Sequence, residues 1–280
     1  MDASPITARH RAIRSLRQAL SDLTGLLLPV TCAGCGTWDA PLCPDCETVL
    51  SGDLRRCEAG APVLAGLSSA AALPTWCLAE YAGAARGIVL AWKGHGDRVV
   101  AAAVRRAGRA AGLAWWAELS GSGHVHDGDG DVVVVPAPSG WRRRASGRRV
   151  VRTLAAEVAR GLTAAATVEQ GRPALQPARR GGGRRSVAMA DVLRRAKGRA
   201  HQAGLGAAGR SANRRRSMRL VAGLPEGSSC LLVDDVLTTG ATLGECRRVL
   251  EADGHRVLGA LVLAATPSAG AVPRARADGR

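Results

Sequence analysis

The chain has 280 residues, a formal net charge of +16 at pH 7 and a hydrophobic content of 46%. This is enough for one α/β domain with a core of its own and a smaller module. No apolar run is long enough for a membrane span or a secretory signal, so we expect a cytoplasmic protein without membrane insertion. A reducing compartment argues against disulfides for the eight cysteines.

Residues 1–29 are predicted to form an amphipathic helix. Its apolar stripe comprises Ile13, Leu16, Leu20, Leu23 and Leu27. Arginines lie off this stripe, which favours packing against the rest of the protein over binding to a membrane surface.

Two Cys-x-x-Cys pairs follow, Cys32 with Cys35 and Cys43 with Cys46. Each pair is able to direct two thiolates at one tetrahedral metal ion, and four cysteines would close a structural Zn²⁺ site. Residues 30–60 are therefore predicted to be a zinc-binding module, too small to fold on a core of its own. Redox or catalytic thiol chemistry is the competing interpretation.

Residues 61–118 are predicted to be a helical segment that covers the functional site, and 119–131 a flexible, glycine-rich linker. Lys93 follows an apolar helical stripe, where ordinary charge compensation at a helix end is the preferred interpretation.

A run of four valines, 132–135, predicts a buried strand that Pro136 and Pro138 end abruptly. The loop after it is expected to bind pyrophosphate through close backbone approach and arginine side chains. Its members are Pro138, Ser139, Gly140, Arg142, Arg143 and Arg144.

Positive charge is concentrated between Arg142 and Arg219, where 21 basic and three acidic residues give a net charge of +18. A field of this size attracts polyanions such as phosphorylated sugars, pyrophosphate or nucleic acid. A solvated surface in an arginine-biased protein explains the same pattern equally well.

The most informative stretch is 230–242, which reads CLLVDDVLTTGAT. Its apolar residues predict a buried parallel strand, so Asp234 and Asp235 lie at the carboxyl end, where open α/β sheets bind ligands. The loop behind them presents backbone N–H groups and hydroxyls at a helix N-terminus, which makes an anion site. This loop contains Thr238, Thr239, Gly240, Ala241 and Thr242. Gly240 is expected to let a phosphate approach the backbone; a plain strand, turn and helix cap is the alternative.

The stretch 230–242 resembles the phosphoribosyl pyrophosphate (PRPP) motif of type I phosphoribosyltransferases. The resemblance implies that Asp234 and Asp235 hold the ribose hydroxyls and hydrated Mg²⁺. It also implies that residues 238–242 bind the 5′-phosphate.

Together with the cysteine pairs, the chain from about residue 20 to 266 resembles the ComF competence-protein family, also described as amidophosphoribosyltransferase-like. Three further stretches carry this resemblance: 81–97 with its Tyr, Gly, Arg and Lys, the strand and loop 134–144, and Gln202-x-x-Leu205 with Arg210 and Asn213. The family joins a short zinc-binding N-terminus to a phosphoribosyltransferase domain.

We therefore expect an α/β fold with a type I phosphoribosyltransferase-like parallel sheet flanked by helices, and a small four-cysteine zinc module at the N-terminus. The sheet domain is predicted over 132–266, with strands at 132–136, 230–234 and 256–264 and helices near 148–165 and 241–252. Residues 267–280 are predicted to be a disordered tail.

The expected function is transfer or exchange of a phosphoribosyl group with release of pyrophosphate, for which PRPP or a nucleotide is the partner. Two alternatives stay open. One is a competence factor that binds single-stranded DNA during uptake, together with other competence proteins. The other is a regulator that senses PRPP.

Overall fold

The computed structural model describes residues 30–65, 72–94, 97–121, 131–138, 150–169, 186–195 and 218–267. The described helices are α2 (Pro44–Thr48), η1 (Glu58–Gly60), α3 (Pro62–Ala65), α4 (Gly83–Gly94), α5 (Arg98–Gly121), α7 (Val150–Glu169) and α9 (Ala241–Ala252). The described strands are β1 (Arg55–Arg56), β2 (Thr75–Glu80), β3 (Val132–Pro136), β4 (Val187–Met189), β5 (Leu193–Arg195), β6 (Met218–Leu220), β7 (Ser229–Leu237) and β8 (Arg256–Ala265).

Six strands form the main sheet, in the order β1-β2-β8-β7-β3-β4. All neighbours pair in parallel except β1, which runs antiparallel to β2 at one edge. The central strands are made of apolar residues that are buried on both faces, as parallel strands covered by helices must be. The strands β5 and β6 form a separate antiparallel pair.

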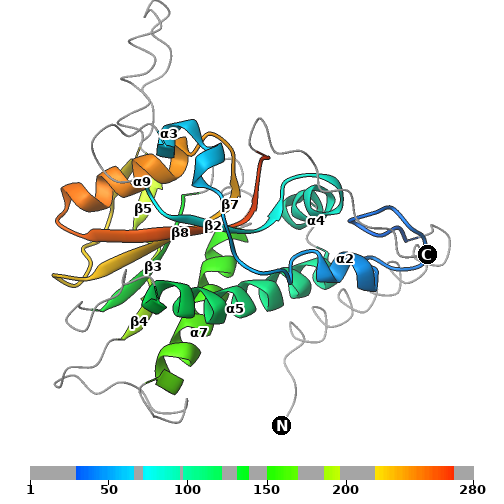
Figure 1. The fold of residues 1–280 in the computed structure, drawn as a ribbon, viewed down its shortest axis with the longest axis horizontal. Coiled ribbons are helices and arrows are strands. Elements are labelled where there is room, and N and C mark those ends of the chain that lie inside the picture. Colours follow the sequence, from blue (N-terminus) through cyan, green and yellow to red (C-terminus); the bar gives the residue numbers. More distant parts are fainter. Residues whose placement is uncertain are drawn as a thin grey trace, which may run out of the picture.

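Helices cover both faces of the main sheet, with α3 and α9 on one side and α5 and α7 on the other (Figure 1). Two apolar cores correspond to these two faces. The larger one joins α4, α5 and α7 to the sheet and extends to Cys32 and Cys46. The smaller one contains Leu64 of α3 and the buried face of α9.

The predicted fold class is confirmed: a mostly parallel sheet flanked by helices, with a cysteine cluster at the N-terminal end. The three predicted strands are found as β3, β7 and β8, and the two predicted helices as α7 and α9. Strand β7 continues three residues past its predicted end, to Leu237, so Asp234 and Asp235 lie inside the strand near its carboxyl end. These five elements could be predicted because each has a signal within its own residues, either a long apolar run or a strong 3.6-residue hydrophobic period.

Strand β2 was not predicted, and it lies inside the range 61–118 that was expected to be helical. Its run Trp76-Cys-Leu-Ala79 is buried on both faces, and a short, fully apolar run does not distinguish a strand from a buried helix. Helix α5 also continues to Gly121, inside the range predicted as a linker.

Several predicted features lie outside the described residues: the N-terminal helix over 1–29, the loop from Ser139 to Arg144, the stretch 202–213 and the tail after Pro267. In the part of the chain that is described, none of the helices combines the length and hydropathy needed to cross a membrane.

Candidate functional site

The candidate site lies at the carboxyl ends of β3 and β7. The strand that follows β3 in the chain, β4, pairs on its other side, so the strand order reverses between β3 and β7. Parallel sheets bind ligands at such a reversal. The Ala137 N–H donates to the Val233 carbonyl at 2.8 Å, which sets the start of the loop after β3 beside Asp234.

Asp234 is partly buried and carries a strongly perturbed carboxyl group. One of its oxygens accepts a hydrogen bond from the Asp235 N–H at 2.8 Å. Burial and the neighbouring Asp235 charge raise the pKa of Asp234 from its usual value of 3.8 to about 7, although that hydrogen bond, Lys93 and Arg195 act in the opposite direction. Two adjacent carboxylates with one raised pKa are typical of a functional site.

Asp235 forms an ion pair with Lys93, the residue near the end of α4, with 2.8 Å between Nζ and Oδ1. Both side chains are mostly buried, exposed by only 16% and 14%. The sequence-based interpretation of Lys93 as an ordinary helix-end charge was therefore wrong. Its ammonium group is directed at the carboxylate pair, from a segment 142 positions earlier in the numbering.

Arg195 is a second cation at the site, and sequence reasoning did not single it out. It ends β5, and its Nε donates to the Pro138 carbonyl at 3.4 Å. Its charge also favours the ionised form of Asp234. Nothing local distinguishes it from the many other arginines between 142 and 219, so only the fold could identify it.

The predicted phosphate loop begins α9, and its side chains at Thr238, Thr239 and Ala241 are exposed. The Thr239 hydroxyl accepts a hydrogen bond from the Ala241 N–H at 3.4 Å. The first turn of this 12-residue helix presents backbone N–H groups and the positive end of the helix dipole, both of which favour anions.

The fold gives a further reason for glycine at position 240. Its φ of +79° is in the left-handed region, and a Cβ there would lie 2.4 Å from the Leu64 side chain of α3. Glycine is therefore required by the turn and by Leu64, whatever binds at the loop. The Val63 N–H donates to the Thr239 carbonyl at 3.1 Å, so α3 is also hydrogen-bonded to the loop.

The raised pKa of Asp234 predicts an effect on stability. A carboxyl whose pKa is about 7 when folded and near 3.8 when unfolded favours the folded state at low pH, and this contribution is lost as pH rises through 7. Asp234→Asn keeps an acceptor oxygen for the Asp235 N–H but cannot ionise. We expect it to raise the free energy of unfolding at pH 8 by at least about 1 kcal/mol, and the melting temperature with it. Both quantities should change little at pH 4. Thermal unfolding at both pH values checks this; an equal effect at both would contradict it.

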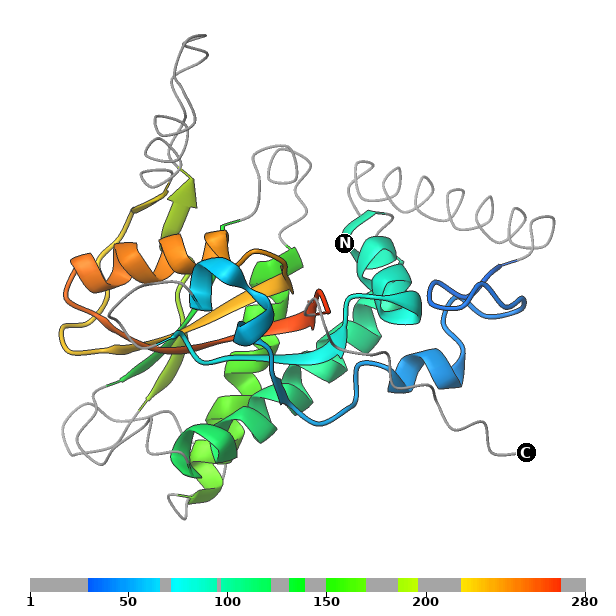
Figure 2. The same ribbon diagram turned by 45° about the horizontal axis from the view of Figure 1, so that its top comes forward.

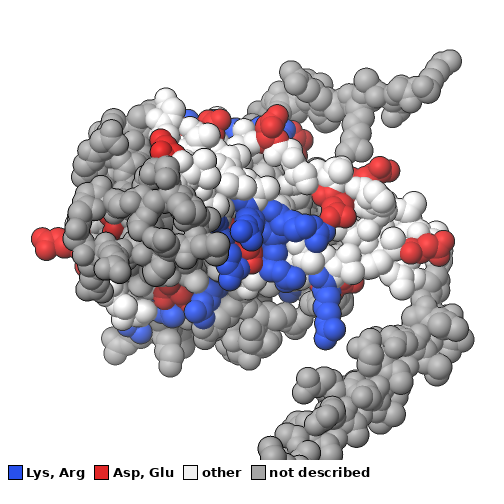
Figure 3. Space-filling model, turned by 90° about the horizontal axis from the view of Figure 1, so that it is seen from below, with Lys and Arg blue, Asp and Glu red and all other residues white. Residues whose placement is uncertain are grey.

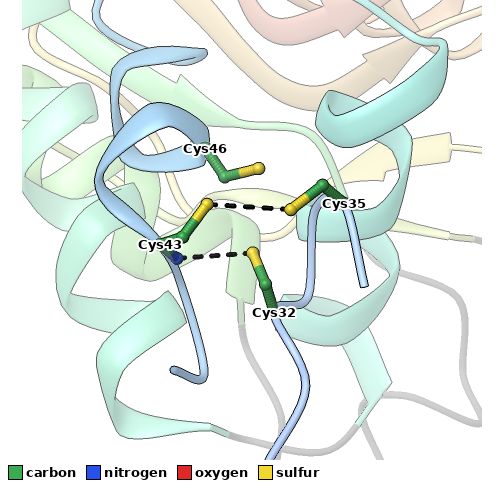
Figure 4. Close-up of side chains that lie close together, drawn as sticks. All are labelled: Cys32, Cys35, Cys43 and Cys46. Carbon is green, nitrogen blue, oxygen red and sulfur yellow. Dashed lines mark hydrogen bonds between the residues drawn. The ribbon is translucent and has the colours of Figure 1, made fainter. Parts of the chain in front are cut away.

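The four cysteines Cys32, Cys35, Cys43 and Cys46 form the second site, with their sulfur atoms all within 4.8 Å of one another. Figure 4 shows these sulfurs turned toward a common centre. The Cys35 and Cys43 sulfurs are 3.7 Å apart, close to the roughly 3.8 Å edge of a tetrahedron with 2.3 Å metal–sulfur bonds.

The electrostatics of this cluster also fit a metal ion. The Cys32 sulfur accepts hydrogen bonds from the N–H groups of Gly34 at 3.4 Å and Cys43 at 3.3 Å. Burial opposes ionisation, but these backbone donors and that of Cys35 lower the pKa of Cys32 to about 6. Burial and the neighbouring thiols raise the pKa of Cys46. Four thiolates at this separation repel one another unless a cation lies between them, so the predicted ligand set is able to hold a metal ion.

Comparison with protein families finds a match in the second half of the chain. Residues 152–278 match the family described as the phosphoribosyl transferase domain. This range contains Asp234, Asp235, Arg195 and the loop 238–242, whereas β2 and β3 of the same sheet precede it. No curated protein matches the chain. Residues 152–278 are therefore similar to a phosphoribosyl transferase domain, and they follow an N-terminal cysteine cluster that is able to hold a metal ion.

Proposed function

We propose that this protein binds PRPP with Mg²⁺ and transfers the phosphoribosyl group to an acceptor, with release of pyrophosphate. One observation carries the proposal. The adjacent carboxylates Asp234 and Asp235 lie at a strand-order reversal, and the exposed loop 238–242 at the start of α9 follows them after the last two residues of β7. A phosphorylated pentose has hydroxyls that would bind to the carboxylates and a phosphate that would bind to the helix N-terminus.

The roles of the residues follow from their positions. Asp234 and Asp235 would hold the ribose hydroxyls and a hydrated Mg²⁺, which oxygen ligands of this kind suit. Residues 238–242 would bind the 5′-phosphate. Pro138 begins the segment that would bind pyrophosphate, and Arg195 lies against its carbonyl.

The chemistry requires charge stabilisation more than proton transfer. The bond between C1 and the pyrophosphate oxygen breaks, the acceptor forms a new bond to C1, and the proton of the acceptor passes to solvent. Bound Mg²⁺ would supply positive charge to the leaving group. Arg195 and Lys93 lie where cations would stabilise the same developing charge, and fixed cations are effective in a partly buried site.

We further propose that the metal of the cysteine cluster is zinc and that the chain is a ComF-family protein. Four cysteine ligands with no open position are typical of structural zinc. The order of the two parts, a four-cysteine cluster before a phosphoribosyltransferase domain, supports the family assignment.

An arginine surface favours nucleic acid binding as a second candidate function. Arg98, Arg105 and Arg109 lie on one face of α5, and Arg152 of α7 is exposed as well. None of these four has an ion-pair partner among the described residues. Figure 3 shows a Lys and Arg patch on the face that lies below the sheet in Figure 1, where α5 and α7 pack. Such a patch fits a phosphate backbone.

One experiment separates the two functions. The protein is incubated with Mg²⁺, PRPP and a panel of nucleobases and amines, and pyrophosphate is measured. We expect release with at least one acceptor, lowered at least about 100-fold in Asp234→Asn/Asp235→Asn because both carboxylates act on the same substrate. Arg105→Ala/Arg109→Ala is the matched control and should leave the rate unchanged. No release with any acceptor, together with salt-sensitive binding of single-stranded DNA that this control abolishes, would favour the second function.

A further inference from the structure

The cysteine cluster contacts α4 through backbone atoms. A Cβ on Gly87 would lie 2.3 Å from the Ala33 carbonyl oxygen and 3.1 Å from that of Gly34. The turn between Cys32 and Cys35 therefore rests directly on the helix, at a position where only glycine leaves room. Figure 2 shows the segment that carries the cysteines (blue) beside α4 (cyan).

The second cysteine pair is part of the same contact. A Cβ on Gly34 would lie 2.6 Å from the Cys46 sulfur and 3.3 Å from the Ala84 side chain of α4. Cys32 and Cys46 are also buried in the core cluster that contains the apolar face of α4, which comprises Ala85, Ile88, Val89 and Trp92. A shift of the cysteine turns therefore cannot be absorbed by empty space and must move α4.

The other end of α4 reaches the carboxylate site. Lys93 lies six positions after Gly87, about 9 Å along the helix at 1.5 Å per residue. Its ammonium group is 2.8 Å from the Asp235 carboxylate. One rigid helix thus touches the cysteine cluster near its start and the candidate substrate site near its end.

We propose that α4 couples the cysteine cluster to the carboxylate site, with Lys93 as the positioning residue. When a metal ion fixes the two cysteine turns, α4 is held where Lys93 meets Asp235 and offsets part of the charge of the carboxylate pair. Without the metal the turns lose their common ligand, α4 is released, and anionic PRPP meets less positive charge. The substrate part of this inference rests on the proposed function.

Coupling of this kind is reciprocal, so it is measurable at the metal without any substrate. The test is the affinity of the purified protein for Zn²⁺, measured by competition with a chromophoric chelator. Lys93→Met removes the contact with Asp235, and we expect it to weaken Zn²⁺ binding by at least about 5-fold, the lower end of typical coupling. Lys93→Arg keeps a cation in reach and should restore most of the affinity.

Arg86→Met is the matched control, because it removes a positive charge from an exposed position of the same helix, closer in sequence to the cysteine contact at Gly87. If charge alone set the Zn²⁺ affinity, this variant would change it at least as much as Lys93→Met does. We expect no change. Equal Zn²⁺ affinities in wild type and Lys93→Met would overturn the proposal.

A second measurement extends the test to the substrate. Addition of Mg²⁺ and PRPP should raise the Zn²⁺ affinity of the wild type and not that of Lys93→Met. If the wild type binds PRPP while its Zn²⁺ affinity stays the same, the coupling is refuted and the proposed function stands. If it binds no PRPP, the proposed function fails, and the substrate-free comparison still decides the coupling.

Discussion

Replacing Gly112 by alanine will lower the free energy of unfolding by about 3 kcal/mol or more, and Gly161→Ala will do the same. These glycines lie where α5 and α7 cross. A Cβ on Gly112 would be 2.2 Å from the Val158 carbonyl oxygen, and one on Gly161 would be 2.1 Å from that of Arg109. Both obstacles are backbone atoms of the opposing helix, so the helices must separate. The better helix propensity of alanine, about 1 kcal/mol, is too small to compensate.

Thermal or urea unfolding measures this effect, which corresponds to a drop of roughly 6 to 12 °C in melting temperature. Alanine substitutions at two other glycines of α5 serve as controls for the loss of stability in Gly112→Ala. Gly108→Ala should be milder, because the atom it meets, at 2.8 Å, is the end of the Leu154 side chain. Gly121→Ala should be neutral, since no heavy atom lies within 4 Å. Equal stabilities of Gly112→Ala and Gly121→Ala would show that the helices do not cross as described.

Removing the metal from the cysteine cluster will destabilise residues 30–60 and also the larger core against which they pack. Cys32 and Cys46 are only 3% exposed and belong to the larger core, which continues through α4 to the sheet. Structural zinc contributes several kcal/mol to the folding of small modules, and a chelator removes that contribution. We expect a strong chelator to lower the melting temperature and to expose tryptophan of α4 and β2, seen as a change in fluorescence.

Cysteine substitutions sharpen this experiment. Cys43→Ser should lose the metal and reproduce the effect of the chelator. Cys230→Ala, at a buried cysteine of β7 outside the cluster, should keep one metal ion per chain. Elemental analysis of freshly purified protein that finds no bound metal would remove the assignment.

The parts of the molecule that could be predicted are those whose sequence motifs lie within one continuous stretch of the chain. Residues 230–242 contain a strand, two carboxylates, a loop and a helix start in one stretch, so their order alone was enough to predict the candidate site. The cysteine cluster was predictable for a similar reason, because its pairs are separated by only a few residues and metal ligands have fixed spacings.

Contacts between segments that are distant in the chain could not be predicted from the sequence. The pairing of Lys93 with Asp235 and of Arg195 with Pro138 depends on how α4 and β5 are placed against the sheet. A second constraint on Gly240 comes from Leu64, which no local pattern connects to the loop. The close crossing of α5 and α7 is likewise invisible until two helices are set face to face.

The most direct test of the account is isothermal titration of the purified protein with PRPP in the presence and absence of Mg²⁺. We predict one site per chain, with binding that requires Mg²⁺ and grows stronger between pH 6 and pH 8 as Asp234 ionises. Asp234→Asn/Asp235→Asn should abolish it, and Arg105→Ala/Arg109→Ala should not. Binding that is unchanged in the double asparagine variant, or no binding by the wild type, would contradict the assignment of this site.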